Sequence, residues 1–428
     1  MRRACGQIIF GGRSARVAVL LLSVAVWLSC GDTFRPIEIP VPSDPGDPQP
    51  FHTAFVISDN GTNNPGTMTQ IDVSGDTNVG VVNVGRGPAY VALLPPSSTR
   101  AYIANLLDNT VSSFQISTGG VAIGAVITTV LPPGSAPVFL ASSEAANMYV
   151  AESGTNKVGV ISSATNVLVA EVSVGINPVA LAETPDGKKL YSVNQGSNNV
   201  TVIDTTDHSV ITTLPVGSSP VLAAARSDSA FIYVLNAGSN SVSVIDTLTQ
   251  TVTGTLNVGA GANSMFYDRR LNRLLVTSGS AGTVSIFDVS VSTPTLLKTL
   301  TVTANPIGAT ALADGTRAYI LSAQIGSTID PTLTVINELT NTITKTIPLA
   351  SVSPLAGCGS VSHRLAIASD AGSSRVYVSS CDAGATSIIR TSDDAFVLDI
   401  PSPVSALPPP APGQQPPPQT PVLVVTGR

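Results

Sequence analysis

Apolar and polar residues alternate in short runs along residues 51–407, and each run is bounded by Gly, Asn, Asp or Pro. One stretch shows the pattern in full, as PVALAETP (178–185), LYSVN (190–194), NVTVID (199–204) and VITTLPVG (210–217). Short β-branched runs between turn residues are typical of strands joined by tight turns. The pattern therefore predicts a unit of four antiparallel strands.

The four-stranded unit recurs along the chain. Its second strand has an aromatic residue, or Leu once, at eight positions: Phe55, Tyr102, Tyr149, Tyr191, Tyr233, Leu275, Tyr319 and Tyr377. A proline opens the first strand of most units, at Pro88, Pro137, Pro178, Pro220, Pro306 and Pro354. Four-stranded units repeated every roughly 40–50 residues are typical of β-propeller blades.

The two ends of the repeat region predict how the ring closes. The first unit lacks its first strand, and PVSAL (403–407) looks like a first strand without successors. Open sheet edges promote aggregation, so a ring joins its first and last blades. We expect an all-β fold, a β-propeller of eight four-stranded antiparallel blades, in which an innermost strand at about 403–407 completes the N-terminal blade. Seven blades, or a parallel β-solenoid, are the alternatives.

The recurring residues resemble a known repeat. The pattern Y-V-x-N, then V-x-V-I-D, then V-x-x-T-I-P-V-G-x-x-P and P-D-G, is similar to the YVTN-type β-propeller repeat of bacterial and archaeal surface proteins. The resemblance is best preserved over 148–260 and extends over about 51–407. It implies a propeller fold and says almost nothing about activity.

The N-terminus has the pattern of an export signal. Residues 1–16 contain four arginines and no acid, and the apolar run VAVLLLSVAVWLSC then ends at Cys30. Such a run is too short to span a bilayer and fits a secretory signal. Its end resembles a bacterial lipoprotein signal, which implies removal of residues 1–29 and a lipid anchor on Cys30. Ordinary signal cleavage nearby is the alternative. We expect an exported, membrane-anchored protein at the outer membrane, periplasm or cell surface.

Two Pro-rich segments flank the repeats. Residues 30–50 are expected to form an extended tether. Residues 408–428 are expected to be a Pro-rich tail that serves as a spacer, although VLVV (422–425) could add to a sheet edge.

Composition narrows the possible chemistry. The net charge of −6 disfavours a nucleic-acid partner, which needs a basic surface. The three histidines, His52, His208 and His363, lie in different units and do not suggest a zinc site. The segment DNGTNN (59–64) is rich in oxygen ligands, but it lacks the acid at its far end that a calcium loop requires. We expect no cofactor, with calcium as a weak alternative.

The repeated polar residues are expected to be structural. Acids or amides end the third strand of several units, at Asp72, Asp204, Asp246, Asp288 and Asn337. An Asx turn, in which the side chain accepts a backbone N–H two residues on, explains this position better than a ring of cation ligands. Cys358 and Cys381 should lie on the same rim of the last blade, and an even pair in an exported domain favours a disulfide.

These features lead to a functional hypothesis. We expect a non-enzymatic envelope module that binds a protein or glycan partner through one rim, with candidate loop residues Gln195, Asn198, Asn199 and Asn240. One alternative is a lactonase-like propeller enzyme, which would need acids, Arg and His around the channel. The other is a passive surface-layer or envelope component.

Overall fold

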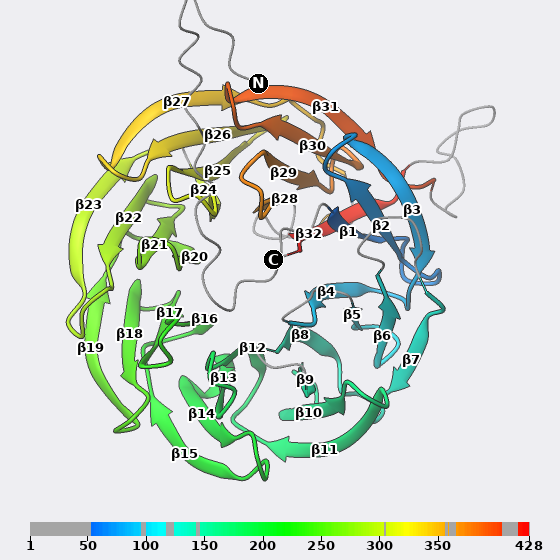
Figure 1. Ribbon diagram of the computed structural model, residues 1–428, viewed down its shortest axis with the longest axis vertical. Coiled ribbons are helices and arrows are strands. Elements are labelled where there is room, and N and C mark those ends of the chain that lie inside the picture. The colour runs from blue at the N-terminus through cyan, green and yellow to red at the C-terminus, as the bar shows by residue number, and fades with distance from the viewer. Residues whose placement is uncertain are drawn as a thin grey trace, which may run out of the picture. The chain divides into compact units, whose positions relative to one another are not determined.

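The protein forms a ring of eight four-stranded antiparallel sheets (Figure 1). The computed structural model describes residues 53–95, 100–116, 124–142, 146–303, 305–355, 358, 365–404 and 418–427. In each blade the strands run from strand A at the centre of the ring to strand D at its periphery. The predicted eight-bladed β-propeller is confirmed, and neither seven blades nor a parallel solenoid fits this topology.

The first four blades contain the N-terminal half of the chain. In order from strand A to strand D they are β32 (Thr420–Thr426), β1 (Thr53–Asp59), β2 (Thr67–Asp72) and β3 (Thr77–Asn83); β4 (Pro88–Leu93), β5 (Arg100–Asn105), β6 (Thr110–Gln115) and β7 (Ile127–Val130); β8 (Pro137–Ala141), β9 (Asn147–Glu152), β10 (Lys157–Ser162) and β11 (Val167–Ser173); and β12 (Pro178–Glu183), β13 (Lys189–Asn194), β14 (Asn199–Asp204) and β15 (Val210–Pro215). A single turn of 3₁₀-helix, η1 (Gln195–Ser197), joins β13 to β14.

Blades 5 to 8 follow in the same way. They are β16 (Pro220–Ala225), β17 (Phe231–Asn236), β18 (Ser241–Asp246) and β19 (Thr251–Asn257); β20 (Ala262–Asp268), β21 (Arg273–Ser278), β22 (Thr283–Asp288) and β23 (Thr295–Thr301); β24 (Pro306–Ala311), β25 (Arg317–Ile325), β26 (Ile329–Asn337) and β27 (Thr342–Pro348); and β28 (Leu365–Ser369), β29 (Arg375–Ser380), β30 (Ala385–Arg390) and β31 (Ala395–Pro401). Strand A of blade 8 thus begins at Leu365 and not at Pro354, so a long connection precedes it.

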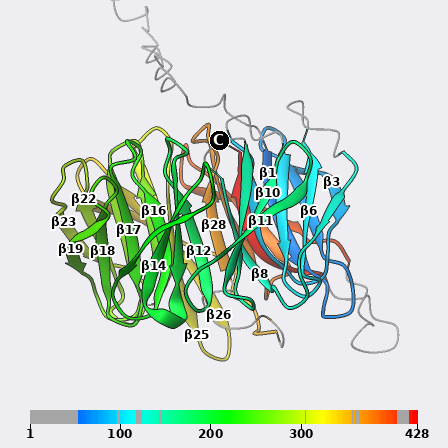
Figure 2. The ribbon, with the colours of Figure 1, turned by 90° about the horizontal axis from the view of Figure 1, so that it is seen from below.

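The turns lie on two rims of the ring. The A–B and C–D turns lie on one edge, which we name the A–B rim. The B–C turns and the connections between blades lie on the other edge, which we name the B–C rim. The hairpin of β25 and β26 is the longest and projects beyond its neighbours on the B–C rim (Figure 2).

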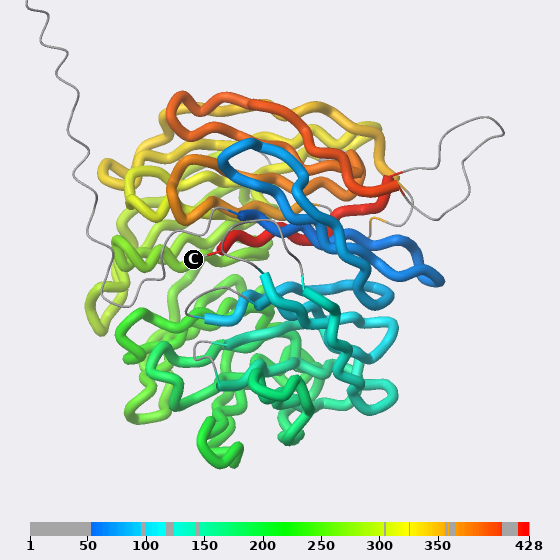
Figure 3. Tube along the Cα trace, turned by 45° about the vertical axis from the view of Figure 1, so that its right-hand side comes forward, coloured from blue at the N-terminus to red at the C-terminus, as the bar shows by residue number. Residues whose placement is uncertain are grey.

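The ring closes through a C-terminal strand, but not through the one expected from the sequence. β32 pairs antiparallel with β1, from Ala54 opposite Thr426 to Asp59 opposite Thr420, and Figure 3 shows this red strand against the blue first hairpin. The prediction that 403–407 completes the first blade is wrong, because Val404 makes only an isolated bridge to Pro418 and is 67 % exposed. The closing strand comes from the segment predicted as a tail, so the propeller extends beyond residue 407.

The hydrophobic core lies between neighbouring blades. In one cluster Val193 and Val200 of blade 4 pack against Ile232 and Val234 of blade 5. Because each sheet is covered on both faces, its central strands are apolar on both sides, which blurs the alternation of a half-exposed strand. The tyrosines of strand B are fully buried in this core at Tyr102, Tyr191, Tyr233, Tyr319 and Tyr377, and Tyr149 is nearly so.

Side chains of strand B also bind the C–D turn of the next blade. The Tyr102 hydroxyl donates to Asn166 Oδ1 at 3.0 Å, and the Tyr319 hydroxyl donates to Asp394 Oδ1. Arg375 of blade 8 donates through Nε and Nη2 to the carboxylate of Asp76 in blade 1, at 2.9 Å. This repeated contact explains why Tyr recurs in strand B, since its ring fills the interface while its hydroxyl reaches the adjacent turn.

The predicted Asx turns are confirmed where strand C ends. The side-chain oxygen of each predicted residue accepts the backbone N–H two residues later, at Asp72, Asp204, Asp246, Asp288 and Asn337. Hydrogen bonds at these turns also hold the pKa of two of the aspartates below its usual value, chiefly the bond from the Thr249 N–H for Asp246 and the bond from the Ser290 side chain for Asp288. The repeated acids therefore stabilise turns.

Candidate functional site

The rim residues predicted to meet a partner are used for contacts within the ring. Asn198 and Asn240 have left-handed backbones, with φ of 53° and 49°. The Asn198 side chain accepts the Ser219 N–H at 2.7 Å, and the Asn240 side chain accepts the Gly261 N–H at 2.8 Å. Each asparagine therefore fastens its B–C turn to the connection that enters the next blade.

The other two predicted rim residues have similar roles. Asn199 Oδ1 accepts the Asn194 amide at 2.8 Å, and Gln195 Oε1 accepts the Asn177 amide at 3.1 Å. The structure thus places all four residues on the B–C rim, as expected, but it gives their side chains partners inside the protein. Whether any of them also meets a ligand stays a prediction.

The predicted disulfide is confirmed. Cys358 and Cys381 are bonded, with Cα atoms 5.7 Å apart and a sequence separation of 23. The bond fastens the long connection before blade 8 to the B–C turn of that blade.

The remaining predicted sites are the lipidation site, the histidines and the DNGTNN segment. Cys30, the proposed lipidation site, and His52 and His363 lie outside the described residues. In the DNGTNN segment Asn60 and Asn64 donate their amides to backbone carbonyls. Within the described ranges no group of three or more His, Cys, Asp or Glu is placed to hold a metal ion. A search of the same ranges identifies no helix with the length and apolar character needed to cross a membrane.

A line of polar side chains crosses several blades near the B–C rim, and we name it the polar column. It begins at the last residue of strand B, continues to the third residue of strand C, and ends at the residue paired with it on strand D. In blade 4 these are Asn194, Thr201 and Thr213, and the Asn194 amide donates to Thr201 Oγ1 at 2.9 Å. Blades 2 and 5 repeat the arrangement as Asn105–Ser112–Thr128 and Asn236–Ser243–Thr255.

Glycines of the connections between blades cover these columns. A β-carbon on Gly175 would lie 2.7 Å from the Asn194 amide nitrogen, and one on Gly217 would lie 2.7 Å from Asn236 Cβ. Both distances are shorter than any real contact of a β-carbon, so only glycine allows this close packing. In these blades the polar column is therefore closed to a ligand.

Blade 8 departs from this arrangement. Its column is Ser380, Ser387 and Asp399, in which a carboxylate replaces the usual threonine of strand D, and Ser387 Oγ donates to Asp399 Oδ1 at 2.6 Å. The connection that precedes this blade, residues 349–364, is much longer than the V-G-x-x-P connections elsewhere. The polar column of blade 8 lines an open hollow.

We name this hollow the blade-8 groove. Its volume is about 410 Å³, within the range of small-molecule sites. It lies between blades 7 and 8 and is lined by Pro331, Leu349, Ala350, Val352, Ser353, Leu355, Leu365, Val378, Ser380, Asp382, Ala383, Ala385, Ser387 and Asp399. The lining combines apolar side chains with hydroxyl and carboxylate groups.

Asp382 holds the long connection in place. Its carboxylate is 7 % exposed, and its Oδ1 accepts the Leu355 N–H at 2.7 Å. Because Asp382 directly follows the disulfide-bonded Cys381, the connection is fastened to the B–C turn twice, by a covalent bond and by a hydrogen bond. The groove therefore has a fixed outer wall at residues 349–355.

Blade 3 also has acids in its polar column, Glu152 at the buried end and Glu171 at the exposed end. Glu152 takes the place of the asparagine, and a β-carbon on Gly159 would lie 2.5 Å from Glu152 Oε1, so the glycine leaves space for the longer acid. Glu152 is fully buried, and only its Oε2 accepts a hydrogen bond, from Thr155 at 3.0 Å. Burial raises the pKa of Glu152 to about 7.

We expect Glu152→Gln to change the pH dependence of stability. With a folded pKa of about 7 and an ordinary unfolded value of 4.5, the folded state binds the proton more tightly. Wild-type stability is therefore lost as pH rises from about 4.5 to 7. Relative to wild type, the variant should gain on the order of 3 kcal/mol between pH 4.5 and pH 8.

Urea denaturation at both pH values measures this difference. Glu338→Gln should act in the same direction up to about pH 8, because burial and then the nearby Asp268 raise the pKa of Glu338 to about 8. If the free energy of unfolding of wild type and of Glu152→Gln changed with pH in the same way, the prediction of a raised pKa for Glu152 would be wrong.

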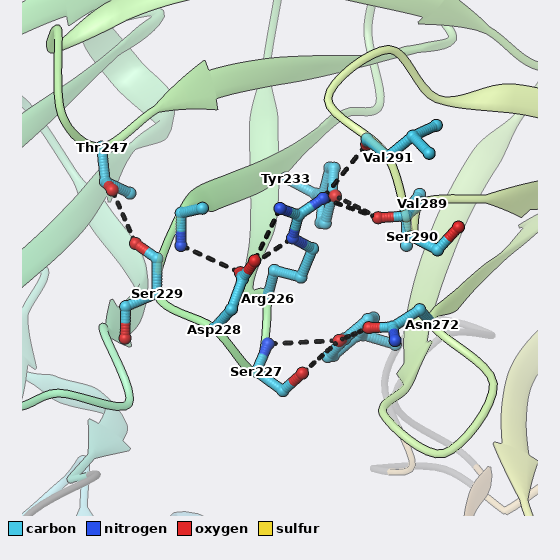
Figure 4. Close-up of polar contacts among 12 residues, drawn as sticks. Arg226, Ser227, Asp228, Ser229, Tyr233, Thr247, Asn272, Val289, Ser290 and Val291 are labelled. Atoms are coloured by element: carbon cyan, nitrogen blue, oxygen red, sulfur yellow. Dashed lines mark hydrogen bonds and ion pairs between the residues drawn. The ribbon is translucent and has the colours of Figure 1, made fainter.

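The A–B rim contains a buried charge at Arg226, but its contacts are structural. Arg226 donates to both carboxylate oxygens of Asp228, at 2.8 and 2.7 Å, and to the carbonyls of Val289 and Val291 in blade 6 (Figure 4). Its guanidinium also lies 4.4 Å from the ring centre of Phe231. Arg226 therefore joins blades 5 and 6 and does not face a cavity.

Comparisons with known proteins bear on the activity. Residues 68–216 match the family model described as "Lactonase, 7-bladed beta-propeller", which is about a third of the chain. No curated protein matches. The matched part spans β2 to β15, and the blade-8 groove lies outside it.

Solved structures share the propeller fold at low identity. A dihydro-heme d1 dehydrogenase has 13 % identity and a TM-score of 0.66, covering 90 % of this chain and 78 % of its own. A putative 6-phosphogluconolactonase from Bacteroides uniformis has 11 % identity and a TM-score of 0.54, covering 70 % and 99 %. Another from Bacteroides fragilis has 14 % identity and a TM-score of 0.52, covering 87 % and 97 %.

The prediction that the protein is not an enzyme is corrected by these comparisons. The family model matched by residues 68–216 describes lactonases, which points towards a hydrolase, whereas the two similar propellers at 11 % and 14 % identity show the fold alone. A lactonase-like enzyme was expected to have acids, Arg and His around the central channel. The Ser387–Asp399 pair was not predicted, because those residues meet only through the register of β30 and β31.

Proposed function

We propose that this propeller is a hydrolase that opens lactone rings, with the blade-8 groove as its active site. The observation on which the proposal depends is the Ser387–Asp399 pair, which lines a groove of about 410 Å³ in a column that glycines close in blades 2, 4 and 5. The partial match to the lactonase family supports the reaction class. The long connection before blade 8 and the aspartate in the polar column of that blade support the location.

The chemistry follows from the groups in the groove. Asp399 is exposed to solvent and takes the proton of a bound water as general base. The water oxygen bonds to the lactone carbonyl carbon, the ring C–O bond breaks, and the proton passes to the departing ring oxygen to give a hydroxy acid. Ser387 donates to Asp399 at 2.6 Å and so fixes the orientation of the carboxylate. Asp382 is a positioning residue, since it holds residues 353–355 over the site.

We expect Asp399→Asn to lower kcat/KM for lactone hydrolysis by about 100-fold or more, because loss of a general base typically costs that much. Proton release in a pH-stat with a panel of γ- and δ-lactones measures the rate. Glu171→Gln is the matched control, because Glu171 holds the same strand-D position in blade 3, paired with Gly159, away from the groove. Equal loss in both variants, or no loss in Asp399→Asn, would refute the assignment.

We also propose that the protein is exported and anchored through a lipid on Cys30. The arginine-rich start and the short apolar run ending at this cysteine support the proposal. Labelled fatty acid should be incorporated into the wild type and not into Cys30→Ser, which should leave the membrane fraction. Retention of the label by Cys30→Ser would contradict it.

A further inference from the structure

We infer that the A–B rim of blades 5 to 7 rests on the anionic lipid surface to which the proposed anchor on Cys30 attaches the protein. The inference rests on that proposed anchor and goes further, because it names the face of the ring that meets the membrane. Three observations support it: a row of exposed apolar side chains, the charge of blade 6, and the rim at which the chain enters the ring.

In three consecutive blades an apolar side chain is exposed in the C–D turn, and another is exposed at the second residue of strand D. Both positions lie at the outer edge of the A–B rim, on strands that follow one another along the periphery in Figure 1. The six residues, which we name the apolar edge, are Leu248 and Val252 in blade 5, Val291 and Leu296 in blade 6, and Leu339 and Ile343 in blade 7. The three turn residues are 88 %, 53 % and 69 % exposed, so they pack little against the ring.

The turns themselves do not require leucine. Leu248 and Leu339 donate their backbone N–H groups to the residue that ends strand C, at 2.8 and 3.0 Å. In blades 1 and 4 the same hydrogen bond comes from Ser74 and Thr206. Because serine or threonine forms the turn equally well, leucine adds only apolar surface in contact with water. A row of such residues, unlike single ones, indicates an interaction surface.

The described residues of the B–C rim do not repeat this arrangement. Val130, at the end of β7, and Ile176, in the connection between blades 3 and 4, are exposed there but occupy different positions. The residues that match Ile176 in the next two connections are Ser218 and Ala260. Exposed apolar residues at matched positions of adjacent blades thus distinguish the A–B rim.

The charge of blade 6 suits an anionic surface. Residues 262–301 have a net charge of +2, whereas the whole chain has a net charge of −6. The charged residues of this blade are Arg269, Arg270, Arg273 and Lys298 against Asp268 and Asp288. Blade 6 lies in the middle of the apolar edge, and a cation near an anionic lipid surface strengthens binding by about fivefold. A lipid surface therefore suits both the apolar side chains and the cations.

The chain enters the ring at the same rim. Thr53 begins β1, which is a strand B, and strand B starts at the A–B rim. The link to the proposed anchor at Cys30 therefore starts on the rim that carries the apolar edge. With this rim on the membrane, the B–C rim, and with it the polar column of blade 8, would face away from the lipid.

Fluorescence quenching in vesicles tests the inference on the full chain. A thiol-reactive bimane is attached to Leu339→Cys, and Ile176→Cys on the B–C rim is the matched control. Labelled wild type gives the background from native cysteines. The vesicles contain phosphatidylcholine and phosphatidylglycerol, with nitroxide groups on the acyl chains. We expect the nitroxide to reduce the emission at position 339 by about half, since interfacial side chains reach the acyl boundary, and to leave that at position 176 nearly unchanged.

Lys298→Glu tests the contribution of charge. Added to Leu339→Cys, this change should weaken the quenching by anionic vesicles and leave the quenching by vesicles of phosphatidylcholine alone unchanged. An equal effect on both kinds of vesicle would overturn the preference for an anionic surface.

Flotation of the same samples separates this inference from the proposed anchor. Vesicle-bound protein with no quenching at position 339, or with equal quenching at both positions, would overturn the inference and leave the anchor standing. Quenching at position 339 in a protein without a lipid on Cys30 would support the inference and overturn the anchor. A spectral shift at position 339 that grows with protein concentration in detergent, without quenching by nitroxide lipids, would indicate a second copy on this edge and overturn the inference.

Discussion

Replacing Val424 with aspartate is expected to prevent the protein from folding into a closed ring. Val424 is 2 % exposed in β32 and packs with Val56 and Tyr377 between blades 1 and 8. A charge there would be buried without a partner, which costs several kcal/mol. It would also release β32 from β1 and leave the edge of β1 open. The free energy of unfolding of a domain is only about 5–15 kcal/mol. Loss of this strand would therefore remove much of the stability of the folded ring.

The matched control is Val404→Asp. Val404 lies in the segment first expected to close the ring, yet it is 67 % exposed. Circular dichroism and size-exclusion chromatography should show a native, monodisperse Val404→Asp variant and an unfolded or aggregated Val424→Asp variant. An unfolded Val404→Asp variant beside a native Val424→Asp variant would indicate that residues 403–407, and not β32, close the ring.

Replacing Arg226 with alanine is expected to destabilise the protein by about 2–3 kcal/mol, because hydrogen bonds from a charged group contribute about 1.5–3 kcal/mol each and the Asp228 carboxylate that stays behind is 54 % exposed. Arg226 is 7 % exposed, and its loss would leave Asp228 and the carbonyls of Val289 and Val291 without their donor. Blades 5 and 6 would then be less firmly joined on the A–B rim. Urea denaturation measures the change in free energy of unfolding.

Arg390→Ala provides the comparison for Arg226→Ala. Arg390 also binds an aspartate, Asp393, at 2.6 Å, but both side chains are about half exposed. Exposed ion pairs contribute about 0–1 kcal/mol. A loss of similar size in the two variants would show that the bonds of Arg226 to blade 6 do not contribute to stability.

The fold could be predicted from the sequence because the repeat is visible in single residues. The strand-B aromatic positions recur since each tyrosine fills an interface between blades and reaches the next C–D turn. The prediction of the closing strand failed because two segments fit the pattern of a proline followed by apolar residues. Pro421 is followed by the apolar residues 422–425, just as Pro403 is followed by Val404 and the rest of the PVSAL segment. The Pro-rich run before Pro421 indicated a tail and so favoured the wrong segment.

The candidate site was harder to predict than the fold. Ser387 and Asp399 are 12 residues apart in number and become neighbours only through strand register. Two signals were present in the sequence: the long insertion before blade 8, and an aspartate where other units have threonine, as at Thr213 and Thr255. Neither signal indicates a groove until the glycine contacts of the other blades are known.

Hydrogen exchange with and without an alkyl δ-lactam, a poorly hydrolysed analogue of a δ-lactone, is the most direct measurement of where a small molecule binds. Full-length protein would be exchanged at saturating ligand, and the protection of each peptide compared. We expect protection at residues 349–355, 376–387 and 395–401, which line or border the blade-8 groove. Protection of the inner strands β4, β12 and β16 instead, with no change at blade 8, would place the ligand in the central channel and contradict the assignment.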